Sequence, residues 1–144
     1  TADDLAKQID AARADGKVSG AALYSAYWLM NNPVSINGVI ASRFPHISLA
    51  PYLGQGDENK PDAPQSLTAT GRKLSWSAVD GCYYAVYKAE GEKAELEAVV
   101  YDTNATAKTD ATYFITAVKK GCNAESLPST LVTTKELPAN MASR

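Results

Sequence analysis

The spacing of hydrophobic residues divides the chain into two parts. Beyond residue 63, short runs rich in β-branched and aromatic residues recur roughly every 8–12 residues, with turn residues between them. This pattern is typical of an antiparallel sandwich. These runs predict strands at about 64–70, 72–78, 82–89, 94–101, 105–108, 112–119 and 129–135.

Alternation along each run predicts which side chains enter the core of the sandwich. Tyr84 and Val86 share the inner face of one strand, so Tyr83 and Tyr87 point the other way. Those two outer tyrosines have two interpretations: a ligand platform, or cross-strand pairing and contact with the first part of the chain. The predicted core consists of Leu67, Leu74, Trp76, Tyr84, Val86, Tyr113, Ile115 and Ala117, whereas Glu95 and Glu97 are expected to face outward.

The first part of the chain follows a different pattern, helix, strand, helix. Thr1 caps a predicted helix over residues 2–15, with Asp4 at its third position and an apolar face that includes Ile9. Residues 18–24 are small or apolar almost without a break, which predicts a strand covered on both faces. An aromatic and amide-rich loop follows, and then Ser35 caps a second helix that ends before Pro45.

A lone strand between two helices cannot satisfy its own ladder hydrogen bonds, and about 50 residues bury too little surface to fold alone. We therefore expect that hydrophobic partners of this segment precede it in a longer protein. Gly, Asp, Glu, Asn, Lys and Pro dominate the next stretch, which indicates a linker. The predicted organisation is a helix-strand-helix segment at 1–53, a linker at 54–63, a sandwich at 64–135 and a loose tail at 136–144.

Charge and hydropathy exclude several classes of partner. Residues 1–62 hold five Lys and Arg against seven Asp and Glu, and residues 63–144 hold nine of each, so neither part is basic. Nucleic acid and anionic membranes are therefore poor partners. No run of about 18 apolar residues exists, so no membrane span is expected.

The two cysteines occupy matching Gly-Cys pairs, one before a predicted strand and one after another. Neighbouring antiparallel strands would bring Cys82 and Cys122 to the same end of a sheet. They either form a disulfide, which would imply an oxidising compartment, or are two unrelated thiols in loops.

The second part carries an ordered set of motifs: the opening Pro64 and Leu67, Trp76, Tyr84 with Val86, and Tyr113-x-Ile-x-Ala followed by Glu125-Ser126-x-Pro128-Ser129. In these residues it resembles a fibronectin type III domain. The resemblance implies a mainly β, immunoglobulin-like antiparallel sandwich in which the Tyr113 hydroxyl bonds an upstream backbone group. Most such domains lack a cysteine pair, and no Arg-Gly-Asp tripeptide supports integrin-type adhesion.

Three motifs in the first part of the chain occur in order: Gly20 to Ser25, then Asn31-Asn32-Pro33, then Leu49-Ala50-Pro51. With them, this part resembles the C-terminal end of a bacterial secreted glycoside hydrolase-like protein of the family-10-like barrel group. The resemblance implies that the segment is the last helix, strand and helix of an α/β barrel, and a fibronectin-like domain after such a barrel is a common arrangement.

Neither resemblance brings catalytic residues to this chain. Glycoside cleavage needs two carboxyl groups at the carboxyl ends of barrel strands, and the barrel-like strand here ends without one. No metal or cofactor is expected, since His46 is the sole histidine and the residues near it offer no second ligand or nucleophile. The remaining candidate is a sugar-contacting loop, whose rings would otherwise simply pack the rim of a barrel; it comprises Ser25, Tyr27, Trp28, Asn31 and Asn32.

Three functions are compatible with these observations. The first is a non-catalytic C-terminal region of a secreted, periplasmic or cell-surface bacterial glycoside hydrolase-like protein, inactive by itself and in contact with the rest of its parent enzyme. The second is a free-standing carbohydrate- or protein-binding module. The third is a structural or cell-surface protein whose first part pairs with another copy of the chain.

Overall fold

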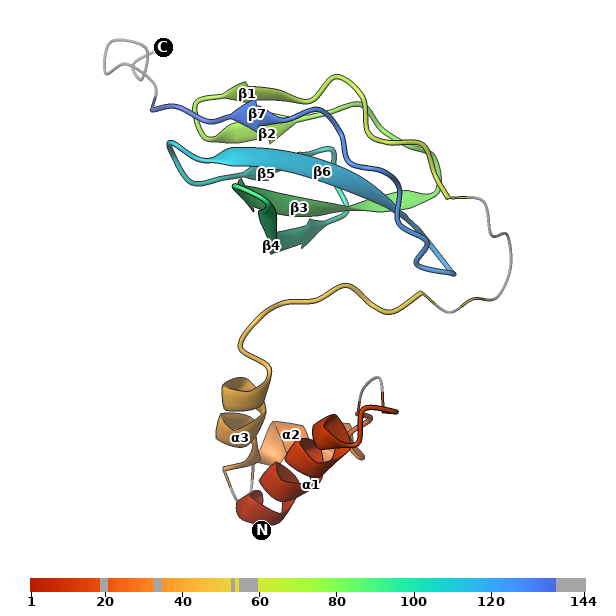
Figure 1. Cartoon of the computed structure of the whole chain (residues 1–144), viewed down its shortest axis with the longest axis vertical. Helices are drawn as coiled ribbons and strands as arrows, with labels where there is room; N and C mark the ends of the chain where they lie inside the picture. The colour runs from red at the N-terminus through yellow and green to blue at the C-terminus, as the bar shows by residue number, and fades with distance from the viewer. Residues whose placement is uncertain (19–20, 33–34, 53, 55–59, 137–144) are drawn as a thin grey trace. The chain divides into compact units, whose positions relative to one another are not determined.

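The structure, a computed structural model, describes residues 1–18, 21–32, 35–52, 54 and 60–136. The chain divides into two compact units, Thr1–His46 and Ile47–Arg144 (Figure 1). Gly20 and Pro33 of the barrel-like motif, residues 55–59 of the expected linker and residues 137–144 of the expected tail lie outside the described residues.

The first unit is helical. It contains α1 (Ala2–Ala14), α2 (Ala26–Asn31) and α3 (Ile36–Arg43). The helix expected over residues 2–15 is confirmed, and so is its cap, because Thr1 Oγ1 accepts a hydrogen bond from the Asp4 amide at 3.3 Å. Helices α1 and α3 contact each other through the Arg43 guanidinium, which donates to both carboxylate oxygens of Asp10 at 3.0 and 2.8 Å.

Three sequence predictions for this unit are wrong. Residues 21–24 form no strand in the structure, and the expected loop after them is the short helix α2. A strand needs a neighbour to satisfy its backbone groups, and the described part of this unit offers none. Ser35 precedes α3 in a left-handed conformation without a capping bond; Asn32 supplies it instead, as its Oδ1 accepts from the Asn37 amide at 2.9 Å.

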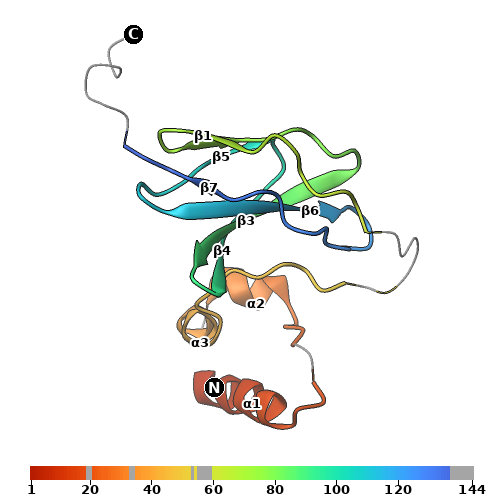
Figure 2. The ribbon, with the colours of Figure 1, turned by 45° about the horizontal axis from the view of Figure 1, so that its top comes forward.

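The second unit is an antiparallel sandwich of two sheets, as the sequence predicts. One sheet has the order β1 (Thr68–Thr70), β2 (Lys73–Ser75), β5 (Asn104–Thr106). The other has the order β4 (Lys93–Val100), β3 (Cys82–Glu90), β6 (Thr112–Lys119), β7 (Val132–Thr133). Figure 2 shows the layer of β1 and β5 above the layer of β3, β4 and β6. The alternation of apolar and polar residues is typical of a sheet with one buried face.

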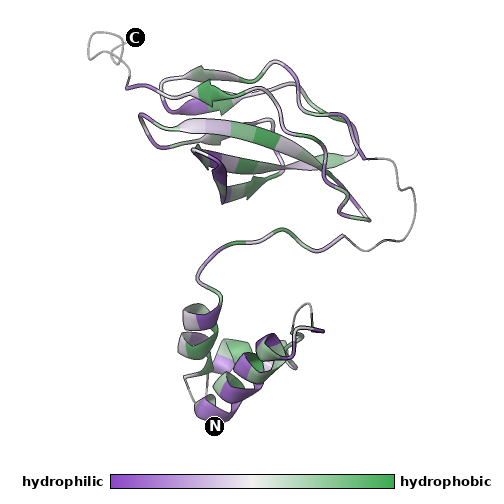
Figure 3. Ribbon diagram, viewed as in Figure 1, coloured by the Kyte–Doolittle hydropathy of each residue, from purple (hydrophilic) through white to green (hydrophobic). Residues whose placement is uncertain are grey.

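The core lies between the two sheets. Trp76 and Tyr84 meet there edge to face, with ring centroids 5.4 Å apart, and Figure 3 shows hydrophobic stretches along β3 and β6. The buried cluster consists of Leu67, Leu74, Trp76, Cys82, Tyr84, Val86, Ala107, Tyr113, Ile115 and Ala117, so it includes every residue expected in the core.

A bulge in β4 corrects the prediction for Glu97. Val86 pairs with Ala98 and Tyr87 pairs with Leu96, so Glu97 is the extra residue of β4 at this point. A bulge shifts the alternation of a strand by one residue. Glu95 accordingly faces outward as expected, while Glu97 is half-buried, with 16% of its side chain exposed.

Two serines close the outer edge of β6, where β7 no longer pairs with it. Ser126 Oγ accepts from the Ala117 amide at 2.9 Å, and Ser129 Oγ accepts from the Ile115 amide at 2.9 Å. The backbone amides of the same serines donate to the carbonyls of the same two residues, at 2.8 and 2.9 Å. The Glu125-Ser126-x-Pro128-Ser129 motif is therefore an edge closure, which blocks pairing with another chain at this position.

Candidate binding surface

The outer face of the β4-β3-β6-β7 sheet is covered in part by the extended residues 47–52, which we call the strap. Leu49 of the strap packs against the cluster of Tyr83, Ala85 and Val118. Asn123 Nδ2 donates to the Pro51 carbonyl at 3.1 Å and fixes the other end of the strap. The strap thus adds to the sandwich a layer that the sequence did not predict.

Glu125 organises the polar side of this face. Its Oε1 accepts hydrogen bonds from the Tyr87 hydroxyl at 2.8 Å and from Thr116 Oγ1 at 2.7 Å. The Tyr87 ring stacks on Phe114 at a centroid distance of 5.0 Å and an interplanar angle of 14°. Burial, followed by the hydrogen bond to Glu125, raises the pKa of Tyr87 well above its usual range, so its hydroxyl stays protonated and donates.

A cavity of about 540 Å³ lies beside the strap. Its lining includes an aromatic residue, an acidic residue, an asparagine and a lysine, residue types that can stack on and hydrogen-bond a polar organic ligand. Its lining residues are Leu49, Ala50, Tyr52, Lys60, Asn123, Ala124 and Glu125.

The two outer tyrosines are less accessible than a ligand platform requires. Tyr83 is only 8% exposed, its hydroxyl donates to Asn123 Oδ1 at 3.1 Å, and the Tyr101 ring lies 5.5 Å from its own ring. Tyr87 is half-buried by its stacking on Phe114. These rings contribute to packing and cross-strand contact. Tyr52 and Tyr101, at 49% and 72% exposure, are more accessible aromatic residues.

The sugar-contacting residues expected in the first unit separate into two groups. Tyr27 and Trp28 lie on α2 with 69% and 50% exposure, and their rings meet edge to face at 6.2 Å. The amides serve local structure instead: Asn31 Nδ2 donates to the Tyr27 carbonyl at 2.8 Å, and Asn32 caps α3. A second cavity, of about 240 Å³, is lined by Leu5, Leu23, Tyr24, Ser25, Trp28, Leu29 and Ile36.

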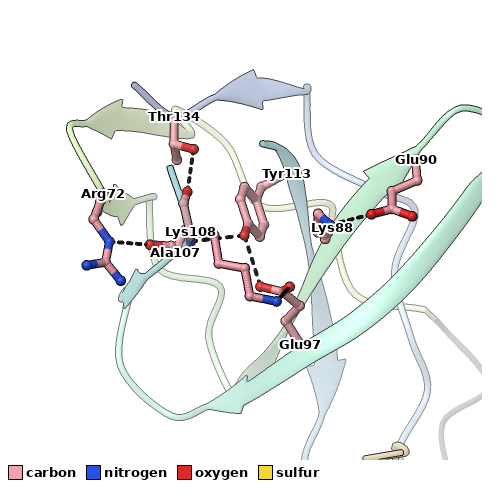
Figure 4. A network of polar contacts seen from close by, with 8 residues as sticks. All are labelled: Arg72, Lys88, Glu90, Glu97, Ala107, Lys108, Tyr113 and Thr134. Atoms are coloured by element: carbon pink, nitrogen blue, oxygen red, sulfur yellow. Dashed lines mark hydrogen bonds and ion pairs between the residues drawn. The ribbon is translucent and has the colours of Figure 1, made fainter. Parts of the chain in front are cut away.

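A charged network lies around Tyr113 (Figure 4). Its hydroxyl accepts from the Lys108 amide at 3.1 Å and donates to Glu97 Oε2 at 2.9 Å, while Lys108 Nζ contacts Glu97 Oε1 at 2.6 Å. Thr134 Oγ1 donates to the Lys108 carbonyl at 2.6 Å. The network links the segment before β6 to β4 and to the end of β7, so its role is structural.

The pKa of Glu97 follows from these contacts. Burial by itself raises this pKa, and the hydrogen bonds from Lys108 and Tyr113 lower it by more, so it lies below its ordinary value. The carboxyl pKa values of Asp4, Asp10 and Glu90 are also lowered, in each case first by a hydrogen bond from a cationic group. A general acid of a glycosidase needs the opposite shift.

Cys82 and Cys122 are both buried and both free thiols. Among the described residues, no group of three or more His, Cys, Asp or Glu side chains is placed to hold a metal ion. None of the helices formed by the described residues combines the length and the apolar character needed to cross a bilayer.

Strand order and core define an immunoglobulin-like antiparallel sandwich. Solved structures similar to the chain include the fibronectin type III domain of human fibronectin type III domain containing protein 3, at 22% identity over 63% of this chain and 99% of that chain, with a TM-score of 0.46. Another is a Fn3-like protein from Clostridium thermocellum, at 24% identity over 56% of this chain and 99% of that one, with a TM-score of 0.43. No family model matches the sequence, and no curated protein matches it.

Sequence reasoning missed Leu49, Tyr52 and the role of Glu125. The sequence links Leu49-Ala50-Pro51 only to the barrel-like motif, since one leucine in an extended segment has no periodicity. The alternation in β3 does indicate a covering segment, because it places Tyr83 and Ala85 together on the outer face, where an apolar patch would otherwise be exposed to solvent.

Proposed function

We propose that this chain is a non-catalytic accessory region of a secreted bacterial carbohydrate-active protein, in which the sandwich acts as a spacer or docking module. The observation that carries the proposal is the contrast between the two units. The sandwich has a closed core, whereas Ile9 is the only fully buried hydrophobic residue among the described residues of the first unit. A unit with so small a core needs further apolar cover, which the rest of a parent protein or another copy of the chain would supply.

The bonds of three carboxyl groups support a non-catalytic role. Asp10 is bound to Arg43, Glu97 to Lys108 and Tyr113, and Glu125 to Tyr87 and Thr116. Each bond uses a carboxylate oxygen that an acid or nucleophile would need free.

The test is an assay of the chain by itself on aryl glycosides and on soluble polysaccharides. We expect no cleavage above the buffer rate. Turnover that is retained after repurification and lost in Glu97→Gln or Glu125→Gln would contradict the proposal.

A second candidate, a carbohydrate-binding module, is favoured by the exposed rings of α2. Aromatic faces stack on sugar rings, and Tyr27 and Trp28 are held side by side on a helix. Trp76 is 6% exposed, so a glycan that binds at α2 would change mainly the fluorescence of Trp28. A saturable blue shift on titration with soluble glycans, lost in Trp28→Ala and kept in Tyr101→Ala, would favour this function over a plain spacer.

A further inference from the structure

The two cysteines lie at the same end of the β4-β3-β6-β7 sheet. Cys82, the first residue of β3, pairs with Lys119, the last residue of β6, and the next amide, that of Lys120, donates to the Gly81 carbonyl at 2.9 Å. The chain then reverses, since the Asn123 amide donates to the Lys119 carbonyl at 2.9 Å. Cys122 lies within this turn, directly beyond the pair that contains Cys82.

Both thiols are enclosed rather than free in solvent. Cys82 is 6% exposed and Cys122 is 7% exposed, and Cys82 Sγ donates to the Asp80 carbonyl at 3.4 Å. Burial raises the pKa of Cys82, and the nearby charges include that of Cys122, which raises it further.

The register of β3 with β6 keeps the two cysteines near each other. Paired residues on antiparallel strands have Cα atoms about 4.5–5.5 Å apart, which lies within the range of about 4.4–6.8 Å seen in disulfides. The partner of Cys82 is Lys119, and Cys122 follows three residues later in a turn in which Gly121 has a φ of 90° and Asn123 a φ of 60°.

We propose that Cys82 and Cys122 form an intramolecular disulfide that closes this end of the sandwich, with a low-molecular-weight disulfide such as oxidised glutathione as the oxidant. One cysteine thiolate attacks the glutathione disulfide, forms a mixed disulfide and releases one glutathione thiolate. The second cysteine thiolate attacks the protein sulfur of that mixed disulfide and releases the second glutathione. Two protein thiols are oxidised, one glutathione disulfide is reduced, and the two protons pass to the released glutathione thiolates.

The bond would staple β3 to β6 across a loop of about 40 residues and restrict the unfolded chain accordingly. We expect it to raise the melting temperature of the sandwich by roughly 10 °C or more. The inference does not depend on the proposed function, although such a bond persists in an oxidising compartment like that of a secreted protein.

The experiment treats the full chain with oxidised glutathione, then removes the reagent and compares it with a reduced sample. We expect a mass lower by about 2 Da, the loss of both titratable thiols, a peptide pair that joins Cys82 to Cys122, and the higher melting temperature. Cys82→Ala and Cys122→Ala are matched controls, and neither should gain stability on oxidation.

Because Cys82 belongs to the core, its alanine variant is read only beside that of Cys122, and the wild-type peptide map decides the result. A native chain that keeps two free thiols under oxidant, or that cross-links only between molecules, would overturn the inference. An intramolecular bond without a rise in melting temperature would overturn the stapling role.

Discussion

At the scale of single residues, the Tyr113 hydroxyl is the clearest test of the network in Figure 4. It satisfies the Lys108 amide and one oxygen of the half-buried Glu97. Tyr113→Phe leaves both groups without this partner, so we expect a loss of about 1–3 kcal/mol in the free energy of unfolding, measured by urea denaturation. Tyr101→Phe, at a ring that is 72% exposed, is the control and should change stability by less than about 0.5 kcal/mol.

Glu97 gives the same network a pH dependence. Its pKa in the folded state lies below the ordinary value of 4.5, so the folded state binds fewer protons than the unfolded state near that pH. The stabilisation is therefore fully present above pH 4.5 and is lost as the pH falls through the folded pKa.

The variant Glu97→Gln should be less stable than wild type at neutral pH, and the difference should shrink below pH 4.5. Urea midpoints measured from neutral pH to below pH 4 test this. Glu95→Gln on the exposed side of the same strand is the control. A Glu97→Gln deficit that stays constant across the range would show that the carboxylate charge is not what stabilises the network.

At the scale of elements, the strap is held to the sheet by one apolar side chain. Leu49→Ala removes the contact with Tyr83, Ala85 and Val118. Since Leu49 is half-buried, we expect a loss of about 1–2 kcal/mol from the sandwich. Ile47→Ala, at a side chain that is 51% exposed, should have a smaller effect; equal losses in the two variants would mean that the strap does not dock through Leu49.

The edge closure of β6 makes a separate prediction. Ser126→Ala removes the acceptor of the buried Ala117 amide, which should destabilise the sandwich by about 1–3 kcal/mol and expose a stretch of unpaired strand. Light scattering during slow heating should show earlier aggregation than in Ser77→Ala, where the serine is exposed. Unchanged stability and unchanged aggregation onset would contradict the role assigned to the motif.

Elements that the sequence predicted correctly are those whose signal is local. Thr1 with Asp4 and the alternation in β3 and β6 are each complete within a few residues. The misses depend on partners far along the chain: the bulge at Glu97 is defined by the register with β3, and Leu49 acquires a role only against Val118. The strand expected over residues 18–24 is a wrong prediction of the opposite kind. Its local pattern is typical of a strand, but the described part of the unit holds no neighbouring strand with which it could pair.

The candidate sites followed the same division. The sequence identified the exposed aromatic residues of α2, since residue type alone carries that signal. It did not identify the cavity beside the strap, because Tyr52 and Glu125 are brought together by the fold and are 73 positions apart in the sequence.

At the scale of the whole molecule, the central claim is that the sandwich is self-sufficient while the first unit has too little core to be stable alone. The first unit relies on exposed polar contacts such as Arg43 with Asp10, which are worth little in water. The sandwich relies on a buried cluster to which both sheets contribute. The two units should accordingly differ widely in local stability.

Native-state hydrogen exchange of the full chain, followed residue by residue, measures this difference most directly. The account predicts that amides in the middle of β3 and β6 exchange only through global unfolding of the sandwich, whereas amides of α1 and α3 exchange at least a hundredfold or so faster, through openings of less than about 3 kcal/mol. Helical amides protected as strongly as those of β3 and β6 would contradict it, because the first unit would then be a stable domain in its own right.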